Sequence, residues 1–117
     1  MALVLYHNPR CSKSRAALAL LQERGYQPEV FEYLKQPPSP RELRAILKKL
    51  GCSAHELVRA TDKKFQQLGL GPITELGEEK LIELMCEHPQ LIQRPILINN
   101  DRARLGRPPE AVLEIAG

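Results

Sequence analysis

The first 36 residues combine two strand patterns with one helix pattern, and this spacing constrains the fold more than any other feature of the chain. Residues 3–6 are a short apolar run, and residues 12–24 favour a helix that ends near Gly25. Residues 29–34 then alternate polar with apolar side chains, as a half-buried strand does. A strand, a helix and a strand in this order predict a βαβ unit with parallel strands and a right-handed crossover.

The middle of the chain is predicted to be helical. Ser39 and Glu42 form a capping-box pattern around Pro40, and Ser53 and Glu56 form a second one. We expect four helices there, over residues 40–50, 53–58, 63–68 and 78–87.

Strand periodicity returns near the end of the chain. Residues 96–98 are a continuous apolar run, residues 99–101 are a turn, and residues 103–105 are the returning strand of a hairpin. A last helix is expected over residues 110–115. The fold class is therefore α/β, with a thioredoxin-like four-stranded mixed sheet (βαβ then ββα) and an all-helical insertion between its halves.

Length and composition indicate one globular domain. At 117 residues the chain can bury a single core, which we place at residues 1–36 and 93–117, with the insertion at residues 37–92. No apolar run is long enough for a membrane span, and the start lacks a signal-peptide pattern, so we expect a cytoplasmic protein. The net charge of +3 is mild and aromatic residues are few, so nucleic-acid binding is not expected.

The cysteines are three in number and widely spaced, at Cys11, Cys52 and Cys86. This pattern indicates reduced thiols and no disulfide framework. The three histidines show no metal-ligand spacing, so no metal site is expected. Cys52 and Cys86 are interpreted as small buried hydrophobic residues.

Cys11 differs from the other two because it follows a strand and stands at the mouth of a helix. The unpaired N–H groups and positive dipole end of that helix would favour a thiolate. Arg10, Lys13 and Arg15 lie nearby with no acidic residue among them. Such surroundings lower the pKa of a cysteine, so we expect Cys11 to be a nucleophile.

Two nearby side chains have two readings each. His7 is either a strand-end residue with no role or an imidazolium that stabilises the thiolate. Ser14 either caps the helix or donates its hydroxyl to the sulfur, and both effects can coexist. Because Cys11 and Ser14 have Cys-x-x-Ser spacing, a second thiol must come from another molecule.

A cysteine phosphatase is the obvious rival, and it requires an arginine six positions after the cysteine. Ala17 occupies that position here. The charge of an oxyanion would then have to be met by arginines remote in sequence, and Arg59, Arg94 and Arg107 are the candidates, although each alone is also consistent with a solvated surface residue. The bond between Arg94 and Pro95 precedes a strand beside the first loop and is a candidate for the cis form.

These residues match a family: the sequence resembles the arsenate reductases that couple to glutathione and glutaredoxin. The matching motifs run in order along the chain and are His7-Asn8-Pro9-x-Cys11-x-x-Ser14-Arg15, Leu57-x-Arg59, Gln67-Leu68-Gly69-Leu70, His88-Pro89-x-Leu91-Ile92-x-Arg94-Pro95-Ile96 and Arg107-Pro108. Within the family, the chain is most similar to the short branch with the motif Asn-Pro-Arg-Cys-Ser-Lys-Ser.

The resemblance implies a reaction and a set of partners. It places the nucleophile at Cys11, the residues that activate it at His7 and Ser14, and the arginines that hold the arsenic oxyanion at Arg59, Arg94 and Arg107. Arsenate or a similar oxyanion would be the substrate, glutathione the co-substrate and glutaredoxin the partner. No metal and no tightly bound cofactor is implied, and the protein is expected to be a monomer.

Two other functions stay open at this point. One is a regulator of the same fold that binds RNA polymerase and senses thiol oxidation, although such relatives use Cys-x-x-Cys where this chain has Ser14. The other is a glutathione-dependent thiol reductase that acts on another substrate.

Overall fold

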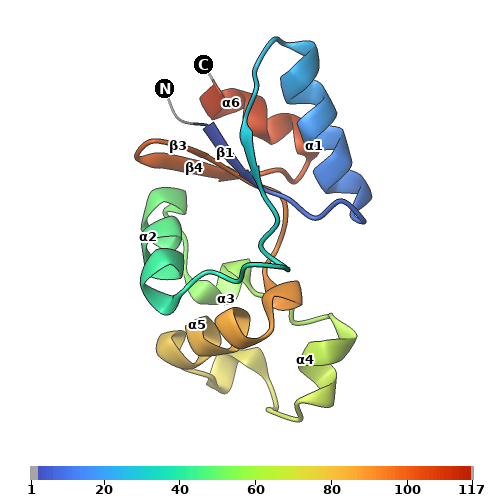
Figure 1. Cartoon of the computed structure of the whole chain (residues 1–117). Helices are drawn as coiled ribbons and strands as arrows, with labels where there is room; N and C mark the ends of the chain where they lie inside the picture. The colour runs from blue at the N-terminus through green and yellow to red at the C-terminus, as the bar shows by residue number, and fades with distance from the viewer. Residues whose placement is uncertain (1–2, 117) are drawn as a thin grey trace. The chain divides into compact units, whose positions relative to one another are not determined.

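The computed structural model describes residues 3–116, which form two compact units (Figure 1). The first unit contains residues 3–36 and 94–116, and the second contains residues 37–93. The chain thus leaves the first unit after the second strand and returns to it just before the third.

The first unit is built on a four-stranded mixed sheet. Its strands are β1 (Leu3–Tyr6), β2 (Glu29–Phe31), β3 (Ile96–Asn99) and β4 (Arg102–Leu105), in the order β2-β1-β3-β4. β1 and β2 are parallel, whereas β3 is antiparallel to both β1 and β4. The predicted α/β class and the thioredoxin-like arrangement, βαβ followed by ββα, are confirmed.

The strand register brings the ends of β1 and β2 and the start of β3 to the same end of the sheet. Tyr6, the last residue of β1, pairs with Phe31 at the end of β2 and with Ile96 at the start of β3. The loop after β1 therefore leaves the sheet between the segment that follows β2 and the segment that precedes β3.

One face of this sheet is covered by helices. α1 (Ser12–Glu23) contributes Ala17 and Leu21 to a core that also contains Leu5 and Leu97. The 3-10 helix η3 (Pro109–Val112) and α6 (Leu113–Ala116) complete this core. The last helix, which was expected over residues 110–115, is therefore a 3-10 turn followed by a short α-helix.

The β3–β4 hairpin is closed by a two-residue turn, Asn100-Asp101. Asn100 has a φ of 58°, a left-handed conformation that asparagine tolerates. The predicted turn over residues 99–101 is confirmed, with Asn99 still in the strand.

β2 is shorter than the strand predicted over residues 29–34. It ends at Phe31, and the Lys35 N–H donates to the Glu32 carbonyl oxygen (3.0 Å), which turns the chain away from the sheet. β2 is also an edge strand, so Val30 is 42% exposed despite its apolar side chain. The alternation in the sequence thus continues beyond the point where pairing with β1 stops.

The second unit is helical, as predicted. Its helices are α2 (Pro40–Leu50), α3 (Ala54–Leu57), α4 (Lys63–Gln67) and α5 (Glu78–Glu87), with 3-10 turns η1 (Ile73–Glu75) and η2 (Pro89–Leu91). α2 and α3 both pack against α5. Leu43 and Leu47 of α2 and Leu81 and Met85 of α5 are buried.

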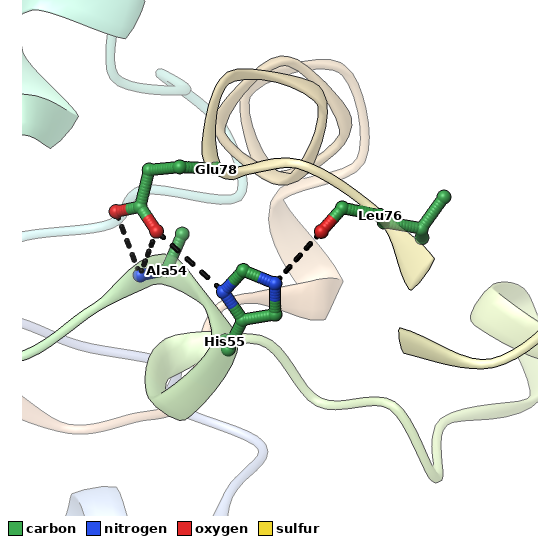
Figure 2. A network of polar contacts seen from close by, with 4 residues as sticks. All are labelled: Ala54, His55, Leu76 and Glu78. Carbon is green, nitrogen blue, oxygen red and sulfur yellow. Dashed lines mark hydrogen bonds and ion pairs between the residues drawn. The ribbon is translucent and has the colours of Figure 1, made fainter. Parts of the chain in front are cut away.

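The first capping box is present and the second is not. Ser39 Oγ accepts from the Glu42 N–H, and Glu42 Oε1 accepts from the Ser39 N–H, both at 3.1 Å. At α3, Ser53 makes no side-chain capping bond. The Ala54 N–H donates instead to the Glu78 carboxylate (2.9 and 3.1 Å), so the capping box predicted for Ser53 and Glu56 was wrong (Figure 2).

The Glu78 carboxylate joins α3 to the start of α5. Glu78 Oε1 also lies 3.6 Å from Nδ1 of His55, whose Nε2 donates to the Leu76 carbonyl oxygen at 2.8 Å (Figure 2). A residue 24 positions from Ala54 therefore satisfies the start of this four-residue helix.

Within residues 3–116, none of the helices combines the length and the apolar character that a membrane crossing needs.

We predict that Ser39→Ala destabilises the protein by about 1 kcal/mol, because it removes a capping bond that Ala cannot replace. Ser53→Ala is the matched control, and it should cost less than about half as much because the Ser53 side chain makes no capping bond. Urea unfolding followed by circular dichroism measures both. Equal losses would mean that the two serines cap alike and that Glu78 does not act as described.

Candidate active site

The site is organised by the loop of residues 7–10, which joins β1 to α1. Cys11 is the N-cap residue of α1, with φ −94° and ψ 123°. Its N–H donates to the Asn8 carbonyl oxygen (3.0 Å), and its carbonyl oxygen accepts from the Arg15 N–H (3.0 Å). These two bonds hold the cysteine backbone at the helix start, so its sulfur faces the first turn, which contains no acidic residue.

Fixed donors lower the pKa of the Cys11 thiol. Burial by itself raises this pKa, but hydrogen bonds from the Ser14 N–H, the Arg94 guanidinium and the Lys13 N–H outweigh it, and the positive charge of Arg94 adds to them. The net shift is downward, as the sequence predicted, so Cys11 ionises more readily than an ordinary cysteine.

The other two thiols shift in the opposite direction. Burial raises the pKa of Cys52, and Glu56 and Glu78 raise it further. Burial is also the main reason that the pKa of Cys86 is raised. Both are half-buried free thiols rather than the fully buried residues that we expected, and both stay protonated where Cys11 ionises.

His7 and Ser14 form a buried hydrogen-bonded pair beneath the loop. His7 Nδ1 lies 2.6 Å from Ser14 Oγ, which also accepts from the Asn8 N–H (3.0 Å). All three residues are almost fully buried, and Ser14 is 0% exposed. Ser14 thus joins α1 to the end of β1 and fixes the path of the loop that carries Cys11.

The charge state of His7 differs from the imidazolium considered in the sequence analysis. Burial lowers the pKa of His7, and the opposing pull of Glu32 does not restore it, while Arg15 lowers it further. The neutral imidazole is therefore favoured at neutral pH. His7 acts on the loop through its bond to Ser14 rather than as a positive charge.

Arg94 and Arg107 lie on the β3 side of the same loop. Arg94 donates to the Cys11 sulfur, and Arg107 Nε donates to the Arg94 carbonyl oxygen (3.2 Å). Both arginines precede cis prolines, Pro95 and Pro108. The cis bond anticipated at Arg94-Pro95 is confirmed, and the second one had no counterpart in the prediction.

Gly106 permits close packing next to these arginines. Its N–H donates to the Pro95 carbonyl oxygen (2.8 Å). A Cβ at this position would lie 2.5 Å from Pro95 Cγ and 3.2 Å from Val112 Cγ1, which is too close without movement. Position 106 therefore needs glycine so that the chain can pass against the proline that follows Arg94.

Arg59 belongs to the second unit. It follows α3, where its N–H donates to the Leu91 carbonyl oxygen (2.6 Å) and its guanidinium pairs with Asp62 (3.6 Å). The structure thus brings five of the six predicted site residues together in the first unit. A role for Arg59 at Cys11 stays a prediction.

Three further residues shape the site although the sequence analysis assigned no role to them. Asn8 supports Ser14 and the Cys11 backbone, Glu32 faces His7, and Gly106 admits Pro95. The Asn-Pro dipeptide at residues 8 and 9 signals a turn and could have indicated the first of them. Glu32 and Gly106 act across the fold and leave no local signal.

Among residues 3–116, histidine, cysteine and acidic side chains form no cluster of three that could hold a metal ion.

We predict that Cys11 is alkylated by iodoacetamide at a lower pH than Cys52 or Cys86, because its pKa is lowered and theirs are raised. The alkylation rate should rise with pH and level off once the thiol is ionised. Arg94→Ala should shift this curve to higher pH by more than His7→Ala does, because His7 is neutral. Mass spectrometry of each alkylated cysteine gives the rates. A larger shift for His7→Ala would indicate that His7 is positively charged and stabilises the thiolate.

The sequence and the structure both match known proteins. The model of the ArsC family matches residues 6–115. The chain is 46% identical to an arsenate reductase of Haemophilus influenzae, covering 98% of this chain and 99% of that protein. It is 51% identical to the uncharacterized protein YfgD of Escherichia coli K12, covering 97% and 95%.

A solved structure agrees closely with the fold. An arsenate reductase from Vibrio cholerae superimposes with a TM-score of 0.92 at 46% identity, and the match covers 98% of each chain. The family match runs from the end of β1 into α6 and includes every residue of the site described above. The chain belongs to the ArsC family.

Proposed function

We propose that this protein is an arsenate reductase that uses the Cys11 thiolate as its nucleophile and glutathione and glutaredoxin as its source of electrons. The observation that carries the proposal is that Cys11, with its lowered pKa, accepts a hydrogen bond from the Arg94 guanidinium. A thiolate beside an arginine provides a nucleophile and a group that binds an oxyanion at one point. The arsenate reductases at 46% identity support the choice of oxyanion.

In the first step, the Cys11 sulfur attacks As(V), a sulfur–arsenic bond forms, and one arsenic–oxygen bond breaks with loss of water. Arsenic is still As(V) at this stage. Arg94 and Arg107 would stabilise the charge on the remaining oxygens, and the same role is proposed for Arg59. His7 and Ser14 contribute by holding the loop in place.

In the second step, glutathione supplies the thiol that Ser14 does not. Its sulfur bonds to the arsenic of the adduct, and a second water leaves. A glutaredoxin thiolate then attacks the glutathione sulfur and forms a mixed disulfide, while the electron pair of the broken bond reduces As(V) to As(III). Hydrolysis of the Cys11–arsenic bond releases arsenite and returns the Cys11 thiol.

Both units would act as one functional domain, because the family match spans them. The enzyme would act as a monomer in the cytoplasm, where glutathione is abundant and thiols stay reduced. No metal, tightly bound cofactor or nucleic acid is needed for these steps.

A glutathione-dependent reductase of another substrate would share the same thiol chemistry. The two functions differ in whether the arginines bind the arsenic oxyanion. The regulator of RNA polymerase is disfavoured because position 14 is a buried serine engaged with His7 rather than a second cysteine.

Cys11→Ser should abolish arsenate reduction, whereas Cys52→Ser and Cys86→Ser should retain most of it, because only Cys11 has a lowered pKa. Turnover is measured as NADPH oxidation coupled through glutathione reductase, with glutathione and glutaredoxin present. Substantial activity in the Cys11→Ser protein would remove Cys11 as the nucleophile. Phosphate and small disulfides tested in parallel would reveal a different substrate.

Replacement of Arg59, Arg94 or Arg107 by Ala should lower arsenate turnover by about one to two orders of magnitude. Each change removes a charge-assisted hydrogen bond worth about 1.5 to 3 kcal/mol, and about 1.4 kcal/mol corresponds to tenfold in rate. Lysine should rescue only in part because it keeps the charge but loses the guanidinium fork.

Arg41→Ala, an exposed arginine on α2, is the control and should leave turnover unchanged. Alkylation of Cys11, measured where the thiol is fully ionised in each variant, should change far less than arsenate turnover. Equal losses in the two assays would indicate a disturbed thiol and would contradict an oxyanion clamp.

A further inference from the structure

A pocket of about 410 Å³ lies in the first unit, between the loop of residues 7–10 and the segment of residues 32–35 that follows β2. Both walls belong to the same unit. The volume is within the range of sites for small organic ligands. The reaction proposed above uses the backbone of this loop but leaves the pocket itself without a role.

The charged groups of the pocket are two cations and one carboxylate. Arg10 stands on the loop wall, and Glu32 and Lys35 stand on the opposite wall. Lys35 Nζ lies 3.4 Å from Glu32 Oε1, and these side chains are 76% and 39% exposed. All three side chains are exposed enough to meet a ligand, while Pro9 and Leu34 supply apolar surface.

The pocket is lined by the residue that precedes the nucleophile in the chain. The loop leaves β1 between the end of β2 and the start of β3. Arg94, which donates to the Cys11 sulfur, lies on the β3 side, whereas the pocket lies on the β2 side. Arg10 is the residue before Cys11, so their Cα atoms are about 3.8 Å apart.

The loop wall is fixed rather than loose. The Arg10 N–H donates to Asn8 Oδ1 (3.0 Å), and the Arg15 guanidinium of α1 donates to the Pro9 carbonyl oxygen (2.9 Å). A ligand in the pocket would thus be held at a set position relative to the start of α1.

We propose that this pocket binds glutathione, the thiol co-substrate, and delivers it to Cys11 from the side opposite Arg94. The inference rests on the proposed function. At neutral pH glutathione carries two carboxylates and one ammonium group. Arg10 and Lys35 match the carboxylates, Glu32 matches the ammonium, and the apolar surface of Pro9 and Leu34 meets the chain between them.

The arsenic oxyanion is a poorer match for the same pocket. The Glu32 carboxylate would repel a multiply charged anion that carries no positive group. The guanidinium that hydrogen-bonds to the Cys11 sulfur belongs to Arg94, which does not line the pocket. A ligand that brings its own cation together with two carboxylates fits these charges better.

The test uses S-methylglutathione, which keeps the charges of glutathione but has no thiol and so cannot react. Binding is measured by isothermal titration calorimetry on the full chain, and its location by amide chemical shifts. We expect the largest shifts in residues 7–10 and 32–35. The diethyl ester, which has a similar size but lacks both carboxylates, should bind more weakly.

Arg10→Ala and Lys35→Ala should each weaken S-methylglutathione binding by about three- to fivefold, the range for a partly solvated charge pair. The same variants should not change binding of the diethyl ester, because the charges they would meet are absent. Lys48→Ala, an exposed lysine on α2 outside the pocket, is the matched control and should bind as the wild type does.

Equal binding of the acid and the ester, wild-type affinity in the two pocket variants, or shifts that map elsewhere would each overturn the proposal. A rise in the KM for glutaredoxin with unchanged S-methylglutathione binding would identify the pocket as a protein-docking surface and overturn it as well. Binding as predicted without arsenate turnover would retain the pocket and remove the proposed substrate. Arsenate turnover without S-methylglutathione binding would retain the proposed substrate and overturn the pocket as the glutathione site.

Discussion

The pairing of Tyr6 with Phe31 on one side and Ile96 on the other is the constraint on which the site depends. Because β1 is central and β3 runs against it, the loop before α1 emerges between two segments that are far apart in sequence. One segment brings Arg94, and the other brings Glu32 and its neighbours. A slip of one residue in either pairing would turn these side chains to the other face of the sheet and separate them from Cys11.

The thiolate is stabilised mostly by groups that cannot move away from it. Two of its donors are backbone N–H groups of the first turn of α1, whose positions are set by the helix, and the third is a guanidinium on a chain fixed by its neighbours. At Cys11, burial opposes ionisation but the donors outweigh it. At Cys52, nearby carboxylates add to the effect of burial, and at Cys86 burial is the largest effect. The three thiols therefore differ because of the donors around them and not because of how deeply they are buried.

The sequence predicted correctly those features that depend on residues close together in the chain. The strand, the helix start at Cys11 and the capping box at Ser39 all depend on residues within a few positions, and each is present. The failures involve distant partners. Glu78 replaces the expected cap of α3, and burial together with Arg15 leaves His7 neutral. The site residues and the insertion that contains Arg59 could be predicted from the sequence, but the charge state of His7 required the fold.

A lowered thiol pKa has two opposed effects on the proposed reaction, and their balance explains the arrangement of donors around Cys11. A less basic thiolate is an intrinsically weaker nucleophile, yet nucleophilicity falls less steeply than the thiolate fraction rises until the pKa reaches the ambient pH. The same low basicity makes the sulfur a better leaving group when arsenite is released. Donors that are fixed in the helix would act on both steps alike, whereas the Arg94 guanidinium would also bind the oxygens on arsenic. In the proposed reaction, the backbone donors would lower the pKa of the thiol, and the arginine would distinguish the substrate.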